Sequence, residues 1–218
     1  MYGKSEKIID LGCGTGMHLK YMQQLGYSTL GFDLSRDMLK QAIINSPRSK
    51  FLCGDFTKIQ LPQKYDSATF MGTSFNYILT DLEFLSFRDS LYKSINNIIV
   101  LDTRNFDNKD NLKSIQNDHL IYENDDVAFN SERSMFFKDG FRILKFFHKV
   151  TFKKTCKQEE FHDESIGKLY TLEKITNLMK DKFKLVKVFG DYNIKTDFSK
   201  NSNRLIAVYK KMNEKQYD

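Results

Sequence analysis

A glycine-rich loop near the N-terminus is the first feature whose residue types and spacing point to chemistry. Gly12, Gly14 and Gly16 directly follow an apolar run at residues 8–11. Glycine has no Cβ and tolerates positive φ, so such a loop turns sharply and lets a ligand approach its backbone. Residues 15–25 have helical apolar spacing. A strand, a glycine loop and a helix N-terminus together predict a site for a nucleotide-like ligand.

An acidic residue ends the next predicted strand. Residues 27–33 close on Asp33, 17 residues after Gly16. A carboxylate at about that distance is placed to accept hydrogen bonds from ribose hydroxyls. Position 17 is Met17, so the dinucleotide pattern Gly-x-Gly-x-x-Gly is absent. Asp33 alone also fits a helix cap or a solvated loop, but the order of strand, loop, helix, strand and acid favours the ribose role.

Three further predicted strands end in polar or aromatic residues. A strand at 51–53 precedes Asp55 and Phe56, a strand at 65–71 runs into the loop 72–77, and a strand at 97–102 precedes Thr-Arg-Asn-Phe-Asp at 103–107. Open α/β sheets bind ligands outside the carboxyl ends of their strands. We therefore expect these loops to line one site, although Asp55 by itself fits a turn cap equally well.

The motifs together resemble those of a known enzyme class. Gly-x-Gly-x-Gly after Asp10-Leu11 resembles the first motif of the class I S-adenosylmethionine-dependent methyltransferases. Residues 71–75, 101–107 and 190–192 resemble the glycine and sarcosine N-methyltransferases, whose close relatives are sugar N,N-dimethyltransferases. The resemblance runs from Ile8 to Lys210. It implies S-adenosyl-L-methionine as the cofactor and an α/β fold, a doubly wound, Rossmann-like sheet of seven strands.

The resemblance also implies roles for individual residues. Arg104 matches the residue that grips the carboxylate of an amino-acid substrate, a task for which a planar guanidinium offers two parallel donors; alternatively it pairs with Asp102 or Asp107. Thr73 replaces a common Asn that receives the amine. Tyr122 falls near a pocket tyrosine, or is an ordinary sheet aromatic. The cofactor wall would comprise Gly12, Gly14, Asp33, Leu34, Asp55, Phe56, Met71 and Ser74.

The alternation of strands and helices stops after the fifth strand. Residues 118–157 are strand-like, with a hairpin turn at Lys138-Asp139-Gly140. We expect them to form a small antiparallel sheet inserted over the active site of a single domain, residues 1–218. Beyond it, Thr171 caps a predicted helix, and strands are expected at 185–191 and 204–209.

Composition limits the compartment and the partners. No apolar run approaches the roughly 20 residues of a membrane span, and the N-terminus lacks a signal peptide. Cys13, Cys53 and Cys156 have no Cys-x-x-Cys spacing, which argues against disulfides or a zinc site and predicts a cytoplasmic protein. The net charge of +6 could suggest nucleic acid, but the lysines are scattered along the sequence, as an AT-rich genome would also produce. The oligomeric state is left open.

We therefore expect an N-methyltransferase acting on a small amine, first an amino acid of the glycine or sarcosine type. The alternatives are a sugar amine, RNA or protein as the substrate, or a non-catalytic cofactor-binding protein. Only seven residues precede Ile8, where the family carries a helical segment that closes over the cofactor. We therefore expect weak cofactor binding unless another segment, such as the insertion, closes the site.

Overall fold

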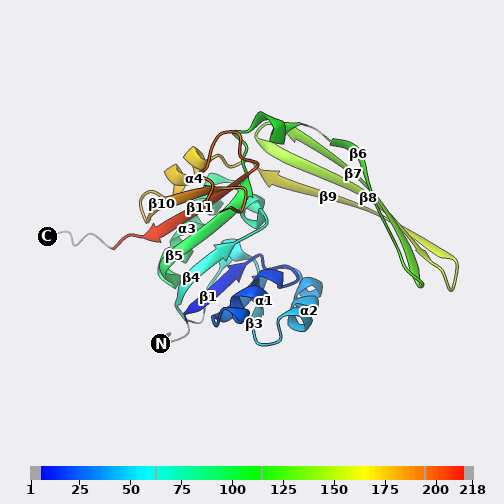
Figure 1. Cartoon of the computed structure of the whole chain (residues 1–218), viewed down its shortest axis with the longest axis horizontal. Helices are drawn as coiled ribbons and strands as arrows, with labels where there is room; N and C mark the ends of the chain where they lie inside the picture. The colour runs from blue at the N-terminus through cyan, green and yellow to red at the C-terminus, as the bar shows by residue number, and fades with distance from the viewer. Residues whose placement is uncertain (1–5, 62, 114, 194, 214–218) are drawn as a thin grey trace. The chain divides into compact units, whose positions relative to one another are not determined.

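The structure, a computed structural model, describes residues 6–61, 63–113, 115–193 and 195–213. It divides into two compact units. The first contains the residues up to Asn108 together with those from Tyr170 onward, and the second is Lys109–Leu169. Figure 1 shows the chain leaving the first unit after β5 and returning to it before α4.

The first unit is built on a seven-stranded sheet in the order β10-β11-β5-β4-β1-β2-β3. β1 to β5 pair in parallel, whereas β11 pairs antiparallel with both β5 and β10. This is the sheet that the sequence predicts. The strands are β1 (Lys7–Leu11), β2 (Ser28–Asp33), β3 (Lys50–Cys53), β4 (Tyr65–Phe70), β5 (Ile95–Arg104), β10 (Phe183–Gly190) and β11 (Arg204–Lys211).

Helices cover both faces of this sheet. α1 (Met17–Gln24) and α2 (Arg36–Asn45) pack near β2 and β3, whereas α3 (Asp81–Ser94) and α4 (Leu172–Met179) pack near β5 and β10. Side chains cap the starts of α2 and α4: Ser35 accepts from the Met38 N–H, and Thr171, as the sequence predicts, accepts from the Lys174 N–H. Each such cap stabilises the helix by about 1 kcal/mol and so helps to fix the residue at which the helix begins.

An aromatic cluster fills the core between the sheet and α3. Phe70 lies edge-on to Phe56 at 5.2 Å and to Phe87 at 5.0 Å between ring centroids. Phe75 and Phe84 both contact the buried ring of Tyr170, at 5.5 and 5.3 Å. Burial of each ring contributes roughly 1.5–3 kcal/mol. The cluster therefore fixes the positions of the loops that follow β3 and β4, because Phe56 and Phe75 belong to those loops.

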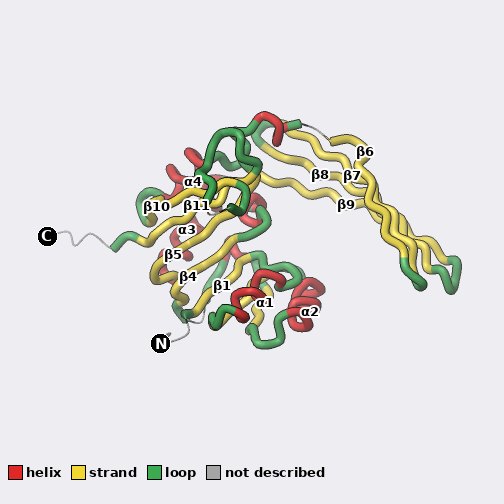
Figure 2. Tube along the Cα trace, in the orientation of Figure 1, coloured by secondary structure: helices red, strands yellow, loops and turns green. Residues whose placement is uncertain are grey.

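The second unit is a four-stranded antiparallel sheet in the order β6-β7-β8-β9, whose strands run side by side in Figure 2. The strands are β6 (Ile115–Glu123), β7 (Val127–Lys138), β8 (Phe141–Phe152) and β9 (Lys157–Lys168). The predicted hairpin turn joins β7 to β8, with φ of 51° at Asp139 and 81° at Gly140.

This unit differs from the predicted insertion, residues 118–157, at both ends. The sequence prediction has no counterpart of β9, because Lys157–Lys168 is rich in charged residues and poor in β-branched ones. β9 is an edge strand, and charged residues on an edge discourage pairing with other chains. The charged composition that suits β9 to the edge of the sheet is therefore also the reason that the sequence pattern does not predict it as a strand. The expected place of this sheet over the active site stays a prediction.

Candidate functional site

A cavity of about 680 Å³ lies at the carboxyl ends of the parallel strands. It holds six of the eight predicted cofactor-wall residues. Gly14 and Met71 are not among its lining residues but are hydrogen-bonded to two of them: the Gly14 N–H donates to Asp33 (2.8 Å), and the Met71 carbonyl accepts from the Ser74 hydroxyl (3.1 Å). The lining residues are Gly12, Asp33, Leu34, Ser35, Asp55, Phe56, Thr57, Ser74, Tyr77 and Glu83.

Glycine is required at position 12 for two reasons. Its φ is +70°, in the left-handed region, and an added Cβ would lie 2.5 Å from the Cβ of Ser74. The Ser74 hydroxyl donates to the Gly12 carbonyl at 3.3 Å. The loop after β1 therefore packs directly against the loop after β4, and the two form one continuous wall.

The Asp33 carboxylate is held by backbone donors on both of its oxygens. Oδ2 accepts from the Gly14 N–H at 2.8 Å and Oδ1 from the Ser35 N–H at 2.9 Å. Each carboxylate oxygen can accept a second hydrogen bond. Asp33 is thus pre-oriented in the cavity wall and retains acceptor capacity for a pair of hydroxyl groups.

The loop after β3 contributes an acid and a ring. Asp55 Oδ1 accepts from both the N–H (2.8 Å) and the hydroxyl (2.7 Å) of Thr57, so it caps the short 3₁₀ turn Phe56–Lys58, called η1. The turn-cap reading of Asp55 therefore holds, and the same residue also lines the cavity. Phe56 is anchored against the core by its contact with Phe70. A flat ring with fixed orientation suits contact with a planar heterocycle.

Asp10, which the sequence analysis does not single out, is the most unusual ionisable group of this region. Its side chain is 1% exposed, and Oδ1 accepts from the Thr69 hydroxyl at 2.6 Å, but Oδ2 has no hydrogen-bond partner. The imidazole of His18 lies beside it, with Nδ1 4.0 Å from Asp10 Oδ2. Burial raises the Asp10 pKa to about 6, against the opposing effects of Thr69 and His18. A cationic ligand would satisfy this carboxylate.

The three predicted substrate residues lie in different parts of the structure. Thr73 follows β4 with a φ of 71°, and its N–H donates to the backbone carbonyl of Asp102 at 3.2 Å, so it lies at the carboxyl edge. Arg104 is half-buried and stands opposite Arg204 in the β5–β11 register. Tyr122 is 55% exposed on β6 in the second unit, and its role stays a prediction.

Asp102 pairs with Arg204, the residue that stands opposite Arg104 in the β5–β11 register. The Arg204 guanidinium donates to Asp102 Oδ1 from Nε (3.0 Å) and Nη2 (2.5 Å). The Tyr192 hydroxyl donates to Oδ2 at 2.6 Å. This edge therefore carries a second forked cation beside Arg104, from a strand that the sequence places about a hundred residues later.

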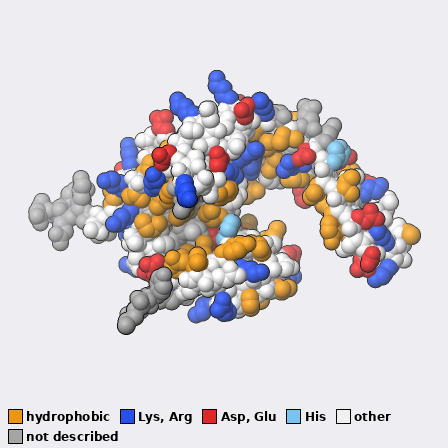
Figure 3. Space-filling view, in the orientation of Figure 1, with side chains coloured by type: hydrophobic (Ala, Val, Ile, Leu, Met, Phe, Trp, Pro, Cys, Tyr) orange, Lys and Arg blue, Asp and Glu red, His pale blue; other side chains and the backbone are white. Residues whose placement is uncertain are grey.

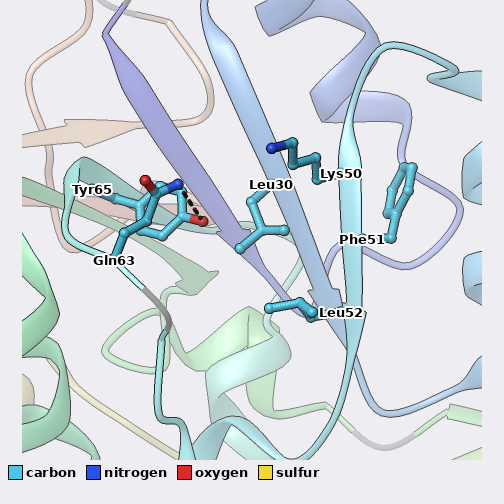
Figure 4. A pocket seen from close by; sticks show the side chains of 6 residues that line it. All are labelled: Leu30, Lys50, Phe51, Leu52, Gln63 and Tyr65. Atoms are coloured by element: carbon cyan, nitrogen blue, oxygen red, sulfur yellow. Dashed lines mark hydrogen bonds between the residues drawn. The ribbon is translucent and has the colours of Figure 1, made fainter.

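A second cavity, of about 640 Å³, lies at the edge of the sheet by β3. Its lining is mostly apolar and carries no carboxylate; Figure 4 shows Gln63 beside Tyr65 and the ring of Phe51 directed away from Leu30. Because its lining has no carboxylate and lies away from the glycine loop, we assign the chemistry to the first cavity. The lining residues are Leu30, Lys50, Phe51, Leu52, Gln63 and Tyr65.

Comparison with known proteins agrees with this geometry. A family model described as a methyltransferase domain matches residues 8–95. A dTDP-3-amino-3,4,6-trideoxy-α-D-glucopyranose N,N-dimethyltransferase of Streptomyces venezuelae is 31% identical over 80 residues, 37% of this chain and 34% of that protein. The match thus spans about a third of that curated relative. The matched residues carry the glycine loop and the first strands of the sheet, and the fold of the chain is that of S-adenosylmethionine-dependent methyltransferases.

Solved structures of this class extend the likeness over nearly the whole chain. A sugar N-methyltransferase from Streptoalloteichus gives a TM-score of 0.78 at 12% identity, covering 94% of this chain and 80% of that one. An S-adenosylmethionine-bound amino pentose methyltransferase from Micromonospora echinaspora gives 0.71 at 15% identity, covering 97% and 85%. These likenesses concern the fold. They agree with the predicted class and cofactor, whereas no comparison supports the narrower glycine or sarcosine type.

Searches for a metal site and a membrane span give no candidates. Within the described ranges, no group of three or more His, Cys, Asp or Glu residues could hold a metal ion. None of the helices in the described part of the chain is long and apolar enough to cross a membrane.

Proposed function

We propose that this methyltransferase transfers a methyl group to the nitrogen of a small amine, and that the amine belongs to a sugar. The observation that carries the proposal is the carboxyl-edge cavity, where Gly12, Asp33, Asp55 and Ser74 meet around about 680 Å³. The sugar-amine part is supported by the relatives, which are named as methyltransferases of aminosugars.

The residues present fit S-adenosylmethionine. The buried, unpartnered oxygen of Asp10 suits the ammonium group of its amino-acid part, Asp33 suits the ribose diol, and Phe56 suits the adenine face. When bound, the cofactor supplies a sulfonium methyl: the amine lone pair forms the C–N bond, the C–S bond breaks, and its electron pair goes to sulfur. The nitrogen then loses its proton to solvent.

The chain's contribution to this reaction is to position the reactants. Holding an amine in line with the methyl group converts a bimolecular step into an effectively unimolecular one. The Gly12–Ser74 contact and the two backbone hydrogen bonds to Asp33 keep the wall rigid before any ligand arrives. No strong base is needed if the amine binds in its neutral form.

An amino acid of the glycine type is the second candidate, and Arg104 is the observation that favours it. A forked guanidinium at the end of β5 suits a carboxylate. However, Arg204 lies across from Arg104, and its own guanidinium is already engaged by Asp102. Arg104→Lys keeps the charge and loses the fork, so a carboxylate-dependent enzyme should lose turnover far more than cofactor binding.

RNA or protein as the substrate is favoured only if lysines surround the site. Figure 3 shows Lys and Arg side chains gathered over α4, β10 and β11. Lys184 and Lys210 stand opposite each other, and Lys210 in turn pairs with Ile98 near the start of β5. These lysines thus lie toward the end of the sheet opposite the glycine loop, which gives the macromolecular alternative no support.

The proposal is tested by methyl transfer from isotope-labelled S-adenosylmethionine to a panel of acceptors. The panel contains dTDP-3-amino-3,6-dideoxyglucose, dTDP-3-amino-3,4,6-trideoxyglucose, glycine and sarcosine, with Asp33→Ala as the control with weakened cofactor binding. We expect transfer to one or both sugar amines, and much slower transfer by the control at the same S-adenosylmethionine concentration. Transfer to glycine or sarcosine alone would replace the sugar assignment with the amino-acid one. Cofactor binding without transfer to any amine would overturn the proposal.

A further inference from the structure

Three residues of the first unit with positive φ lie around the ion pair that the buried Asp102 forms with Arg204. Thr73, Asp191 and Tyr192 have φ of 71°, 57° and 55°, although none is glycine. The Thr73 N–H donates to the backbone carbonyl of Asp102, the Tyr192 hydroxyl donates to the Asp102 carboxylate, and Asp191 Oδ1 accepts from the N–H of Arg204, the partner of Asp102, at 2.7 Å. Such backbone conformations are unfavourable for residues other than glycine and concentrate at functional sites.

Asp102 is an anchor and not itself open to a ligand. It is 0% exposed, and Arg204 compensates its charge through a forked contact. Its Oδ2 also accepts from the Gly72 N–H at 2.8 Å. The carboxylate therefore ties the start of β11 to the loop after β4, and whatever is bound to it is held in a fixed place at the carboxyl edge.

Tyr192 is the member of this network that reaches solvent. The residue is 58% exposed, and the guanidinium of Arg204 lies 5.3 Å from the centroid of its ring. Its hydroxyl proton is committed to Asp102, so the oxygen is available only as an acceptor. Donation to a carboxylate also polarises the phenol and strengthens that acceptor.

The phenol also keeps its proton at neutral pH. Burial, followed by the hydrogen bond to Asp102 and the charge of that carboxylate, raises the Tyr192 pKa to about 12, against the opposing effect of Arg204. Tyr192 therefore does not act as a base. It can orient a donor, and the donor expected at this edge is an N–H group.

The network and the cofactor cavity share a loop. Gly72, which donates to Asp102, is two residues before Ser74, which lines the cavity and contacts Gly12. We propose that Tyr192 positions the substrate: its oxygen accepts an N–H of the neutral amine and so directs the nitrogen lone pair toward the sulfonium methyl. This inference rests on the proposed N-methyltransferase function and names a substrate contact within it.

The test is Tyr192→Phe, which keeps the ring beside Arg204 and removes the oxygen. Tyr21→Phe is the matched control, since Tyr21 is 59% exposed on α1. The measurements are kcat and KM with dTDP-3-amino-3,6-dideoxyglucose and labelled S-adenosylmethionine, calorimetric affinity for S-adenosylhomocysteine, and the thermal midpoint. One lost hydrogen bond predicts a roughly tenfold fall in kcat for Tyr192→Phe. S-adenosylhomocysteine affinity and the KM for S-adenosylmethionine should not change, and Tyr21→Phe should match the unsubstituted protein.

Three outcomes contradict the inference, and they are distinguishable. Unchanged kcat in Tyr192→Phe overturns the contact and leaves the methyltransferase function standing. A fall in kcat that merely follows a lower thermal midpoint or weaker S-adenosylhomocysteine binding assigns Tyr192 a structural role instead. Absence of transfer by the unsubstituted protein to every acceptor of the panel overturns the proposed function, and this inference with it.

Discussion

Each unit of the protein contains an arginine–aspartate pair, and the two pairs lie in very different surroundings. In the first unit Arg204 forks onto Asp102, whose side chain is fully buried. In the second unit Arg133 contacts Asp118 across β6 and β7, with 43% and 46% of the two side chains exposed. The same chemistry therefore serves as a rigid internal anchor in one place and as a solvated surface contact in the other.

The difference reflects how each unit is held together. The first unit has a large apolar core that includes Phe70, Phe84 and Tyr170. In the second unit, Met135 is the only hydrophobic side chain that is buried among the described residues. A site whose side chains must hold their positions to within a fraction of an ångström needs a packed core beneath it. The comparison therefore places the demanding cofactor chemistry on the first unit.

The largest expected effect separates the two pairs directly. Arg204→Ala leaves Asp102 buried without its cation, which should lower the free energy of unfolding by about 3–5 kcal/mol. Arg133→Ala disrupts a half-exposed pair and should lower it by less than about 1 kcal/mol. Urea unfolding followed by circular dichroism measures both. Equal losses in the two variants would break the comparison.

Two glycines with positive φ give the next contrast. A Cβ at Gly12 would collide with Ser74, whereas one at Gly140, in the β7–β8 turn, would meet nothing within 4 Å. Gly140→Ala should therefore cost only backbone strain, about 1–2 kcal/mol. Gly12→Ala should cost about 1–3 kcal/mol more from overpacking and should also abolish S-adenosylhomocysteine binding. Thermal unfolding measures the stability of both variants, and calorimetry measures their affinity for S-adenosylhomocysteine. Intact binding in Gly12→Ala would disprove the assignment of Gly12 to the wall of the cofactor cavity.

A smaller effect concerns pH and Asp10. Because burial raises its pKa in the folded state to about 6 from a usual value of 3.8, the folded state holds this proton more tightly than the unfolded state. The stability that Asp10 contributes is thus present at low pH and is lost as pH rises through about 6. Asn is neutral at every pH. The stability of Asp10→Asn relative to the unsubstituted protein should therefore increase as the pH rises from 5 to 7.5.

Thermal midpoints at the two pH values test this sign. His18 and Asp33 are the neighbouring side chains that act on the Asp10 pKa. The same comparison is therefore repeated with His18→Gln present in both proteins. Asp37→Asn on the exposed start of α2 is the control and should show no such gain. The same difference between Asp10→Asn and the unsubstituted protein at both pH values would contradict the burial argument.

Local signals made much of the first unit predictable from sequence. The glycine loop, the acid at the end of β2 and the helix cap at Thr171 each act within a few residues, so spacing alone reveals them. Burial was less accessible. Leu82 fits the helical spacing of α3 yet is 80% exposed, because the core lies beside Phe84 and Phe87.

Contacts between distant residues could not be foreseen. Asp102 and Arg204 are 102 residues apart in sequence, and only the antiparallel register of β11 on β5 makes them neighbours. Asp10 lies inside an apolar run, where nothing in the sequence shows which of its two oxygens lacks a partner. The one available signal was the acid itself, since a carboxylate in a strand buried on both faces requires an explanation.

Calorimetric titration of S-adenosylhomocysteine into Asp33→Ala tests the cofactor site most directly. Asp37→Ala, an exposed aspartate four residues later, is the control. Loss of the carboxylate that faces the ribose diol should weaken binding by roughly 1.5–3 kcal/mol, since two hydrogen bonds to a charged group disappear. The account predicts that weakening in a folded Asp33→Ala protein and unchanged affinity in Asp37→Ala. Equal affinities in the two variants would contradict the assignment of this cavity to the cofactor.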